Sequence, residues 1–125
     1  MKTAIVAAVL SFILSGLSAC QDENLTTFGS TLIRVHNSSA YGYEDMVVND
    51  AAFGDLGPGE NSQYQFFDTA YRYAYVRLLI NGAEFILQPI DYVGETPLGS
   101  GHFTYVIDVF DLDNRQLSIS MIQDN

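Results

Sequence analysis

Two histidines, His36 and His102, are the first candidates for acid–base chemistry because their side chains titrate near neutral pH. A serine hydrolase would need one of them to activate a serine, and Ser100 lies two positions before His102. A nucleophile elbow requires a strand, a Gly-x-Ser-x-Gly turn and a helix, and this segment has neither the spacing nor the helix. It is therefore predicted to be a flexible turn that enters a strand. Two distant histidines without a cysteine or His-x-Glu partner do not predict a zinc site.

Three acidic residues, Asp108, Asp111 and Asp113, surround one expected turn together with Asn114. Such oxygen ligands suit calcium, but the calcium loop with its central glycine and terminal glutamate is missing. Asp and Asn are also ordinary turn residues, because their side chains bond to nearby backbone groups. The turn is the favoured interpretation and calcium the weaker one, so no cofactor is expected. Carboxylate pairs for glycoside hydrolysis depend on separation in space, which sequence does not supply.

Tyrosines alternate along one predicted strand at Tyr71, Tyr73 and Tyr75, and Arg77 follows at the same spacing. If no second sheet covers them, they form a flat aromatic platform that can stack on sugars or bury against a partner protein. The alternative is ordinary cross-strand packing, which is the commoner role of tyrosine in a sheet. The absence of tryptophan makes glycan binding a less favoured interpretation.

The N-terminus has the pattern of an export signal. A short positive start at Lys2 precedes an apolar run over 4–14 and a small-residue cleavage region. That run is shorter than the roughly 20 residues that a membrane-spanning helix needs. The motif Leu17-Ser18-Ala19-Cys20 resembles the lipobox of bacterial lipoproteins, which implies cleavage before Cys20, a diacylglyceryl thioether on its sulfur and acylation of the new N-terminus.

Lipidation also accounts for the single cysteine, which would otherwise be an odd thiol in a secreted protein. Several acyl chains anchor a protein firmly, because two already suffice for stable attachment. The alternative is an ordinary cleaved signal followed by a chance cysteine. With Cys20 as the anchor, cysteine catalysis is excluded.

The segment 21–24, Gln-Asp-Glu-Asn, is short and acidic. It resembles the stretch that marks surface export in lipoproteins of Bacteroidetes, and the alternative is a solvated linker. We expect an outer-membrane location with display at the cell surface. The predicted organisation is a signal peptide over 1–19, a lipidated N-terminus and tether over 20–29, and one domain over 30–125.

Charge restricts the classes of partner. The chain has 15 acidic residues against 5 basic ones, and Lys2 in the signal is its only lysine. Nucleic-acid binding is disfavoured because its affinity depends on neutralising phosphates. The same charge disfavours contact of the domain itself with anionic lipid, and lysine chemistry is excluded from the mature chain.

Short β-branched and aromatic runs separated by Gly, Pro, Asn and Asp predict strands throughout the domain. The expected strands are 31–37, 43–50, 62–67, 71–80, 83–90, 102–110 and 116–122. The longest connections are then 51–61 and 91–101, and loops on a rigid scaffold are where binding concentrates.

Asn81-Gly82 predicts a two-residue type I′ hairpin, whose two central positions both need a positive φ. This turn places Ile80 opposite Ala83 and Leu78 opposite Phe85. The face expected in the core consists of Val76, Leu78, Ile80, Ala83, Phe85 and Leu87. On the other face Arg77 and Glu84 are diagonal neighbours, within reach of an ion pair. A second hairpin is expected around 111–115.

About seven short strands predict an all-β fold, an antiparallel two-sheet β-sandwich of immunoglobulin-like or transthyretin-like type. A small closed barrel is the alternative. The segments 71–76 (Tyr-Arg-Tyr-Ala-Tyr-Val) and 88–94 (Gln-Pro-Ile-Asp-Tyr-Val-Gly) resemble the small, uncharacterised β-sandwich outer-membrane lipoproteins of Bacteroidetes. That resemblance implies no catalytic residues.

The sequence therefore predicts a non-catalytic envelope protein, attached to the membrane through Cys20, that binds a protein or a glycan. Two alternatives remain. A small hydrolase or lyase would require His36 or His102 to meet two acids in a cleft. A structural subunit of an envelope assembly would show a long uncovered edge strand.

Overall fold

The computed structural model describes residues 30–89 and 95–124, and all regular structure within them is β-strand. The eight strands are β1 (Thr31–Asn37), β2 (Tyr43–Val48), β3 (Ala51–Leu56), β4 (Gln65–Phe67), β5 (Val76–Ile80), β6 (Ala83–Leu87), β7 (Gly101–Asp111) and β8 (Gln116–Asp124). The all-β prediction is confirmed. The signal peptide, Cys20, the tether and residues 90–94 lie outside the described residues.

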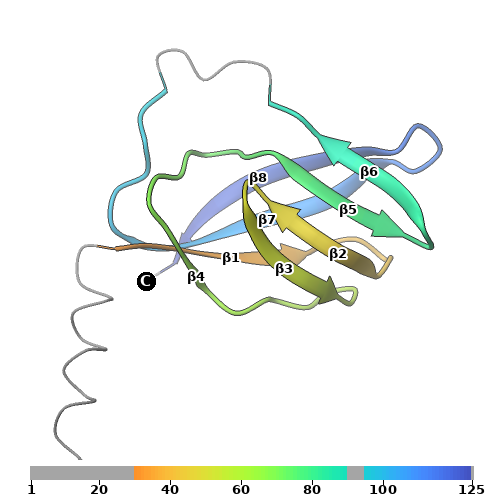
Figure 1. Cartoon of the computed structure of the whole chain (residues 1–125), viewed down its shortest axis with the longest axis horizontal. Coiled ribbons are helices and arrows are strands. Elements are labelled where there is room, and N and C mark those ends of the chain that lie inside the picture. The colour runs from red at the N-terminus through yellow and green to blue at the C-terminus, as the bar shows by residue number, and fades with distance from the viewer. Residues whose placement is uncertain (1–29, 90–94, 125) are drawn as a thin grey trace, which may run out of the picture.

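The strands form two four-stranded sheets that lie one over the other (Figure 1). One sheet has the order β4-β1-β7-β8 and the other the order β3-β2-β5-β6. The pairing is antiparallel except between β1 and β7, which run parallel from Thr31↔Gly101 to Asn37↔Ile107. The two-sheet sandwich is thus confirmed, with one parallel pair that sequence did not predict.

The core lies between the sheets, because every second residue of a strand points to the same face. In β1 the alternate residues Ile33 and Val35 are fully buried. Tyr105 and Ile107 of the neighbouring β7 are fully buried beside them. The opposite sheet contributes the buried side chains of Met46, Val48, Val76, Leu78 and Phe85.

The predicted hairpin at Asn81-Gly82 is confirmed with its register. Ile80 pairs with Ala83 and Leu78 with Phe85. Asn81 and Gly82 have φ values of 49° and 80°, as a type I′ turn requires. The six residues assigned to the core are buried or pack against it. The hairpin of β7 and β8 is also confirmed, with a turn over 112–115.

Other strand predictions need correction. The expected strand 71–80 begins only at Val76, and the expected strand 62–67 only at Gln65. The expected loop 51–61 contains β3, which joins β2 through a tight turn at Asn49 and Asp50. β3 was missed because its sequence, AAFGDL, is poor in β-branched residues, and its pairing with β2 is irregular. Neighbouring β2 ends at Val48 rather than at residue 50, and β6 ends at Leu87.

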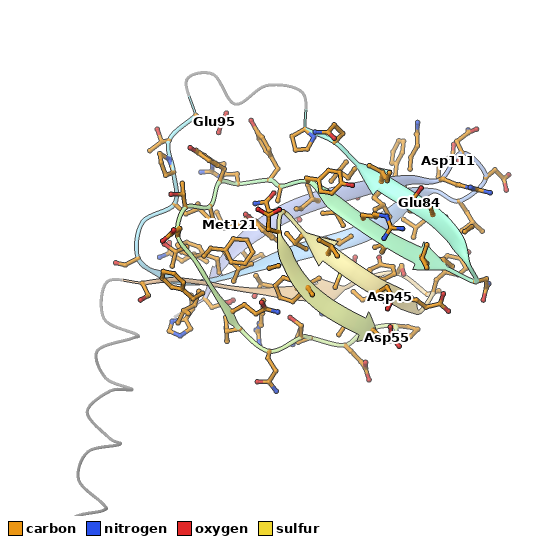
Figure 2. All side chains as sticks on the ribbon, in the orientation of Figure 1. Asp45, Asp55, Glu84, Glu95, Asp111 and Met121 are labelled. Carbon is orange, nitrogen blue, oxygen red and sulfur yellow. The ribbon has the colours of Figure 1, made fainter. Side chains whose placement is uncertain are left out.

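The sandwich has two distinct ends. At one end, here the base, β1 begins and β8 finishes (Figure 1). At the other end, here the tip, lie the connections 38–42, 57–61, 81–82 and 112–115. Acidic side chains occur at both ends, with Glu84 and Asp111 toward the tip and Glu95 at the base (Figure 2).

Candidate functional site

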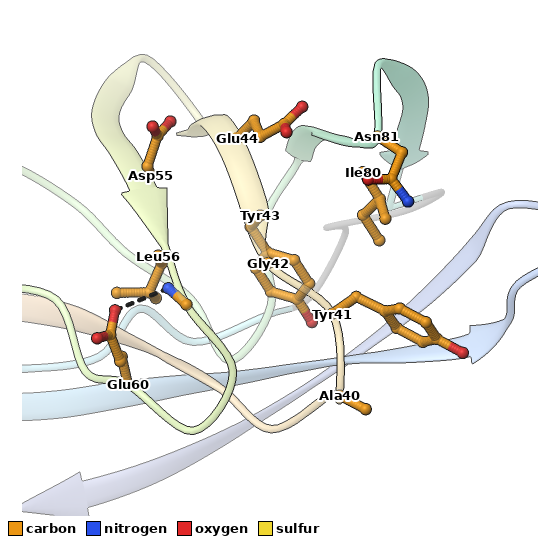
Figure 3. A pocket seen from close by; sticks show the side chains of 11 residues that line it. Ala40, Tyr41, Gly42, Tyr43, Glu44, Asp55, Leu56, Glu60, Ile80 and Asn81 are labelled. Atoms are coloured by element: carbon orange, nitrogen blue, oxygen red, sulfur yellow. Dashed lines mark hydrogen bonds between the residues drawn. The ribbon is translucent and has the colours of Figure 1, made fainter.

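A groove of about 480 Å³ opens at the tip, between the 38–42 connection, the end of β3 and the β5–β6 turn (Figure 3). It is lined by Ala40, Tyr41, Gly42, Tyr43, Glu44, Asp55, Leu56, Gly57, Glu60, Ile80 and Asn81. None of these positions was singled out individually as a binding residue from sequence, although Asp55, Leu56, Gly57 and Glu60 lie in the connection 51–61 that was expected to carry binding. The signal that could have found them is the cluster of Gly, Pro and Asn turn residues around 57–61.

Asn37 holds the groove wall in place from inside the protein. Its side chain is fully buried, and its Nδ2 donates to the carbonyl oxygens of Tyr41 at 2.7 Å and Leu56 at 3.1 Å. Its Oδ1 accepts from the backbone N–H of Ser39 at 2.9 Å and from the Ser39 hydroxyl at 2.8 Å. Buried polar groups are retained where they are fully hydrogen-bonded. Asn37 therefore links the 38–42 connection to the end of β3.

Tyr43 forms the floor of the groove. Its ring is buried, and its hydroxyl donates to the carbonyl oxygen of Ile107 at 2.8 Å, which joins the two sheets. Burial raises the pKa of Tyr43 to about 12, because the interior disfavours the phenolate. The hydroxyl thus remains protonated and structural at neutral pH.

The carboxylates of the groove are engaged by the backbone. Glu60 accepts from the N–H of Gly57 at 2.7 Å, and Asp55 from the N–H of Asp45 at 3.0 Å. Glu44 accepts from the N–H of Gly82 at 3.3 Å. Glu44 and Asp55 project on the same side of the groove, whereas Glu60 folds back onto Gly57 (Figure 3).

The described lining of the groove combines three carboxylates with tyrosine side chains. Its described lining contains no basic residue, no histidine and no cysteine. Tyr41 is 37% exposed and lines the groove together with the carboxylates. Such a surface accepts hydrogen bonds from hydroxyl or cationic groups and stacks on a flat apolar face.

The tyrosine stripe is not a platform on a strand. Tyr71, Tyr73 and Tyr75 precede β5 and are each half-buried. The carbonyl oxygen of Tyr71 accepts from the hydroxyl of Tyr105 at 2.6 Å. The backbone N–H of Tyr75 donates to Oδ1 of Asn49 at 3.1 Å, and its carbonyl oxygen accepts from the Asn49 N–H at 2.8 Å. The alternation of tyrosines in the sequence therefore does not place the three side chains on one face of a strand.

One of these tyrosines lines a second hollow, of about 730 Å³, near the base. The hollow is lined by Asn49, Asp50, Ala51, Phe66, Phe67, Asp68, Thr69 and Tyr75. Phe66 is 60% exposed. Of the four predicted binding residues, the structure brings only Tyr75 to a described cavity.

Arg77 lies on the outer face of the second sheet and forms an ion pair with Glu84, as the hairpin register predicted. Both side chains are more than one-third exposed, so the pair contributes little to stability. Arg77 does not lie beside the tyrosines on a continuous strand face, because β5 begins after them.

The histidines lie apart. Nδ1 of His36 is 2.8 Å from Oδ1 of Asn61, and His102 packs edge-on against Tyr64 with ring centroids 4.8 Å apart. Neither lines the tip groove or the hollow near the base. The convergence of a histidine with two acids in a cleft is not found among these residues.

A polar cluster on the outer face of the first sheet was not foreseen. Asp124 accepts from the hydroxyl of Thr104 at 2.6 Å and from that of Tyr64 at 2.9 Å. Arg34 Nε donates to Thr104 Oγ1 at 3.0 Å, and its guanidinium lies 5.0 Å from the Tyr64 ring centroid. Partial burial and the bond to Asp124 raise the pKa of Tyr64. The cluster connects side chains from four chain segments and holds the end of β8 against them.

Of the three aspartates weighed for calcium, Asp111 stabilises the β7–β8 turn, whereas Asp108 lies within β7. Asp111 accepts from the side-chain amide of Asn114 at 2.8 Å and from its backbone N–H at 3.2 Å, and these bonds lower the pKa of Asp111. Asp108 accepts from the backbone N–H of Val109. No group of three or more His, Cys, Asp or Glu side chains suited to a metal occurs within 30–89 and 95–124.

Comparisons with known proteins found no matching family model, no matching curated protein and no matching solved structure. Within the described residues, no helix is long and apolar enough to cross a membrane.

Proposed function

We propose that this protein is a non-catalytic, lipid-anchored component of the bacterial outer membrane that binds another protein or a glycan at the tip of its sandwich. The observation that carries the proposal is the position of the groove. It lies at the opposite end of the domain from the point where the predicted tether joins β1. A ligand at the groove is therefore not obstructed by the anchor.

The chemistry of the groove favours binding over catalysis. Its carboxylates already cap backbone N–H groups, and Tyr41 supplies an exposed aromatic face. A ligand with hydroxyl or cationic groups next to a flat apolar surface fits this lining. Asn37 and Tyr43 hold the wall and floor of the groove rigid. The groove is therefore preformed, and a ligand orders little of the protein on binding.

The anchor is tested by Cys20→Ser in cells supplied with a labelled fatty acid. The wild-type chain is expected to incorporate label and the variant none, because the serine oxygen does not replace the sulfur that receives the lipid. Label in the variant would refute the lipobox interpretation. Replacing Asp22 and Glu23 by alanine should leave the label in place and reduce cleavage by protease added to whole cells.

The binding surface is tested by placing a photo-crosslinking amino acid at Tyr41 or at Tyr75, in the full chain on intact cells. The proposal expects a crosslinked protein or glycan from Tyr41 and not from Tyr75. A product only from Tyr75 would locate binding at the base, and no product from either position would contradict a binding role for both surfaces. Tyr41→Ser should abolish the interaction without loss of fold, since Tyr41 is exposed.

A structural role in an envelope assembly is the second candidate, because one specific observation favours it. β8 is a long edge strand that pairs only with β7 among the described strands. Exposed edges of this kind accept a further strand.

A further inference from the structure

Each sheet of the sandwich ends in two edge strands, which are β4 and β8 in one sheet and β3 and β6 in the other. An edge strand exposes unpaired backbone N–H and C=O groups and is a template for another chain. Proteins blunt such edges with short strands, bulges, charges or covering side chains. The four edges of this protein differ in how far they are protected.

Three of the edges are protected. β4 has only 3 residues. The pairing of β3 with β2 is irregular, and the Ala52 carbonyl of β3 accepts from the side chain of Gln65 at 2.8 Å. β6 has 5 residues and carries the charged Glu84, which is held by Arg77. None of these strands offers a long regular ladder.

β8 is neither short nor irregular, and it is uncharged along almost all of its length. It is 9 residues long and contains no glycine or proline, and its first charged residue is Asp124 at its very end. Its pairing with β7 runs without a shift from Leu117 to Asp124. Among the strands that the structure describes, β8 has no hydrogen-bonded neighbour on its other side, and the strand of the opposite sheet that lies close to it is β6. The partly buried side chains of Ile119 and Met121 pack on the core from this margin.

We propose that β8 is an interface between two copies of this chain, in which each copy pairs its β8 antiparallel with the other about a two-fold axis. Such isologous contacts are the commonest form of symmetric association. The pairing would merge the two β4-β1-β7-β8 sheets into one continuous sheet. The inference goes beyond the proposed function and does not require the groove to bind a ligand.

The pattern of β8 is complementary to itself. Leu117, Ile119 and Met121 point to the core side, and Ser118 and Ser120 to the outer side. If the two-fold axis passes through Ile119 or through Ser120, each odd-numbered residue lies opposite an odd-numbered residue of the other copy, and each even-numbered residue opposite an even-numbered one. Core-side residues therefore face core-side residues, and outer residues face outer residues. Aliphatic side chains then meet aliphatic ones on the inner face, and the exposed serines lie near each other outside.

Charge favours a second copy at this edge. With 15 acidic and 5 basic residues, two copies repel over most of their surfaces. Residues 116–123 carry no charge, and Asp124 at the end of the strand is partnered by Thr104 and Tyr64 and lies 3.9 Å from Arg34. The longest edge strand is thus also one along which two acidic copies can approach without placing like charges opposite each other.

Antiparallel pairing sets the base of one copy beside the tip of the other, so the two tip grooves lie at opposite ends of the pair. A tether of about ten residues reaches at most roughly 35 Å. A nine-residue strand spans about 30 Å. Two copies anchored at Cys20 in one membrane can therefore still pair when their strands lie along its surface.

The test uses two differently tagged versions of the full chain, produced in the same cells and solubilised in detergent. Capture of one tag is expected to bring the other version with it. Ser118→Glu combined with Ser120→Glu in both versions should reduce this co-capture by at least about tenfold, because like charges then meet across the axis. The matched control is Ala52→Glu, which adds one negative charge to the protected edge of β3 and is compared with Ser120→Glu alone, which adds one to β8.

Thermal melting of the same variants separates association from folding. Ser118 and Ser120 are exposed, so the double variant should melt close to the wild type. A second readout is the disulfide formed on adding an oxidant. Ser120→Cys should crosslink to itself if the axis passes through Ser120, and to Ser118→Cys in the other copy if it passes through Ile119. The proposal is overturned if the wild-type versions do not co-capture, if Ala52→Glu abolishes co-capture equally, or if no cysteine combination forms a dimer.

Discussion

Asn37 is expected to be the polar residue on which the tip of the sandwich most depends. Its amide is fully buried and takes part in four hydrogen bonds, with the carbonyls of Tyr41 and Leu56 and with the N–H and hydroxyl of Ser39. Asn37→Ala removes all four bonds and leaves a cavity in place of the amide. It thereby disconnects the 38–42 connection from β3.

The expected loss follows from these contacts. A hydrogen bond contributes about 0.5–1.5 kcal/mol net, and a buried group left without a partner costs about 1–3 kcal/mol. Asn37→Ala should therefore lower the free energy of unfolding by about 2–5 kcal/mol. That is a large share of the roughly 5–15 kcal/mol that stabilises a typical domain. In a domain of this size it lowers the melting temperature by at least about 10 °C.

The assay is urea unfolding of the chain from residue 21, followed by far-ultraviolet circular dichroism. Ser39→Ala is the matched control, because it removes the hydroxyl that bonds to Asn37 and to the backbone of Tyr41 but leaves the other three bonds of Asn37, and it should cost less than Asn37→Ala. Asn37→Asp keeps the shape but loses both N–H donors. Burial raises the pKa of the introduced carboxyl, so this variant should be most stable in acid and lose stability as pH rises. A loss below about 1 kcal/mol for Asn37→Ala would refute the role assigned to the network.

Three further outcomes are expected. The pKa of Tyr43 is raised from 10 to about 12, so the stability that its protonated hydroxyl contributes is complete below pH 10 and is lost as pH rises toward 12. Tyr43→Phe should therefore reduce the loss of stability between these pH values. A pH dependence of unfolding identical to the wild type would contradict this. Leu78→Ala should cost about 2–5 kcal/mol and Leu79→Ala less, since Leu78 is fully buried and Leu79 only partly; equal losses in urea unfolding would invalidate the face assignment. Gly82→Val should destabilise the hairpin, because a β-branched residue does not readily hold a φ of 80°; an unchanged melting temperature would show that the turn adapts.

The sequence by itself predicted the features that depend on neighbouring residues. Asn81-Gly82 requires a tight turn, and a two-residue turn fixes which residues of β5 and β6 face each other. The expected turn around 111–115 likewise predicted that β7 and β8 form a hairpin. The pattern also sufficed for the all-β class and the two-layer plan.

Other features depended on tertiary structure. β3 has a weak strand sequence and exists because β2 offers it a partner. The tyrosine segment alternates like a strand, but Tyr105 and Asn49 hold its backbone in another conformation. The parallel pairing of β1 with β7 joins two strands that lie far apart in the sequence, and it follows from the order of the strands in the sheet.

The tip groove shows most clearly which features follow from local sequence and which from tertiary structure. Its residues come from three separate connections, and only folding of the two sheets brings Tyr41, Asp55 and Asn81 together. Asn37 appears in the sequence as one more polar residue at the end of a strand, yet it is buried and holds that end of the sandwich together. Alternation and turn chemistry act over a few residues and can be read directly from sequence. Burial and hydrogen-bond partners are set by contacts between distant segments, so only the folded chain decided them.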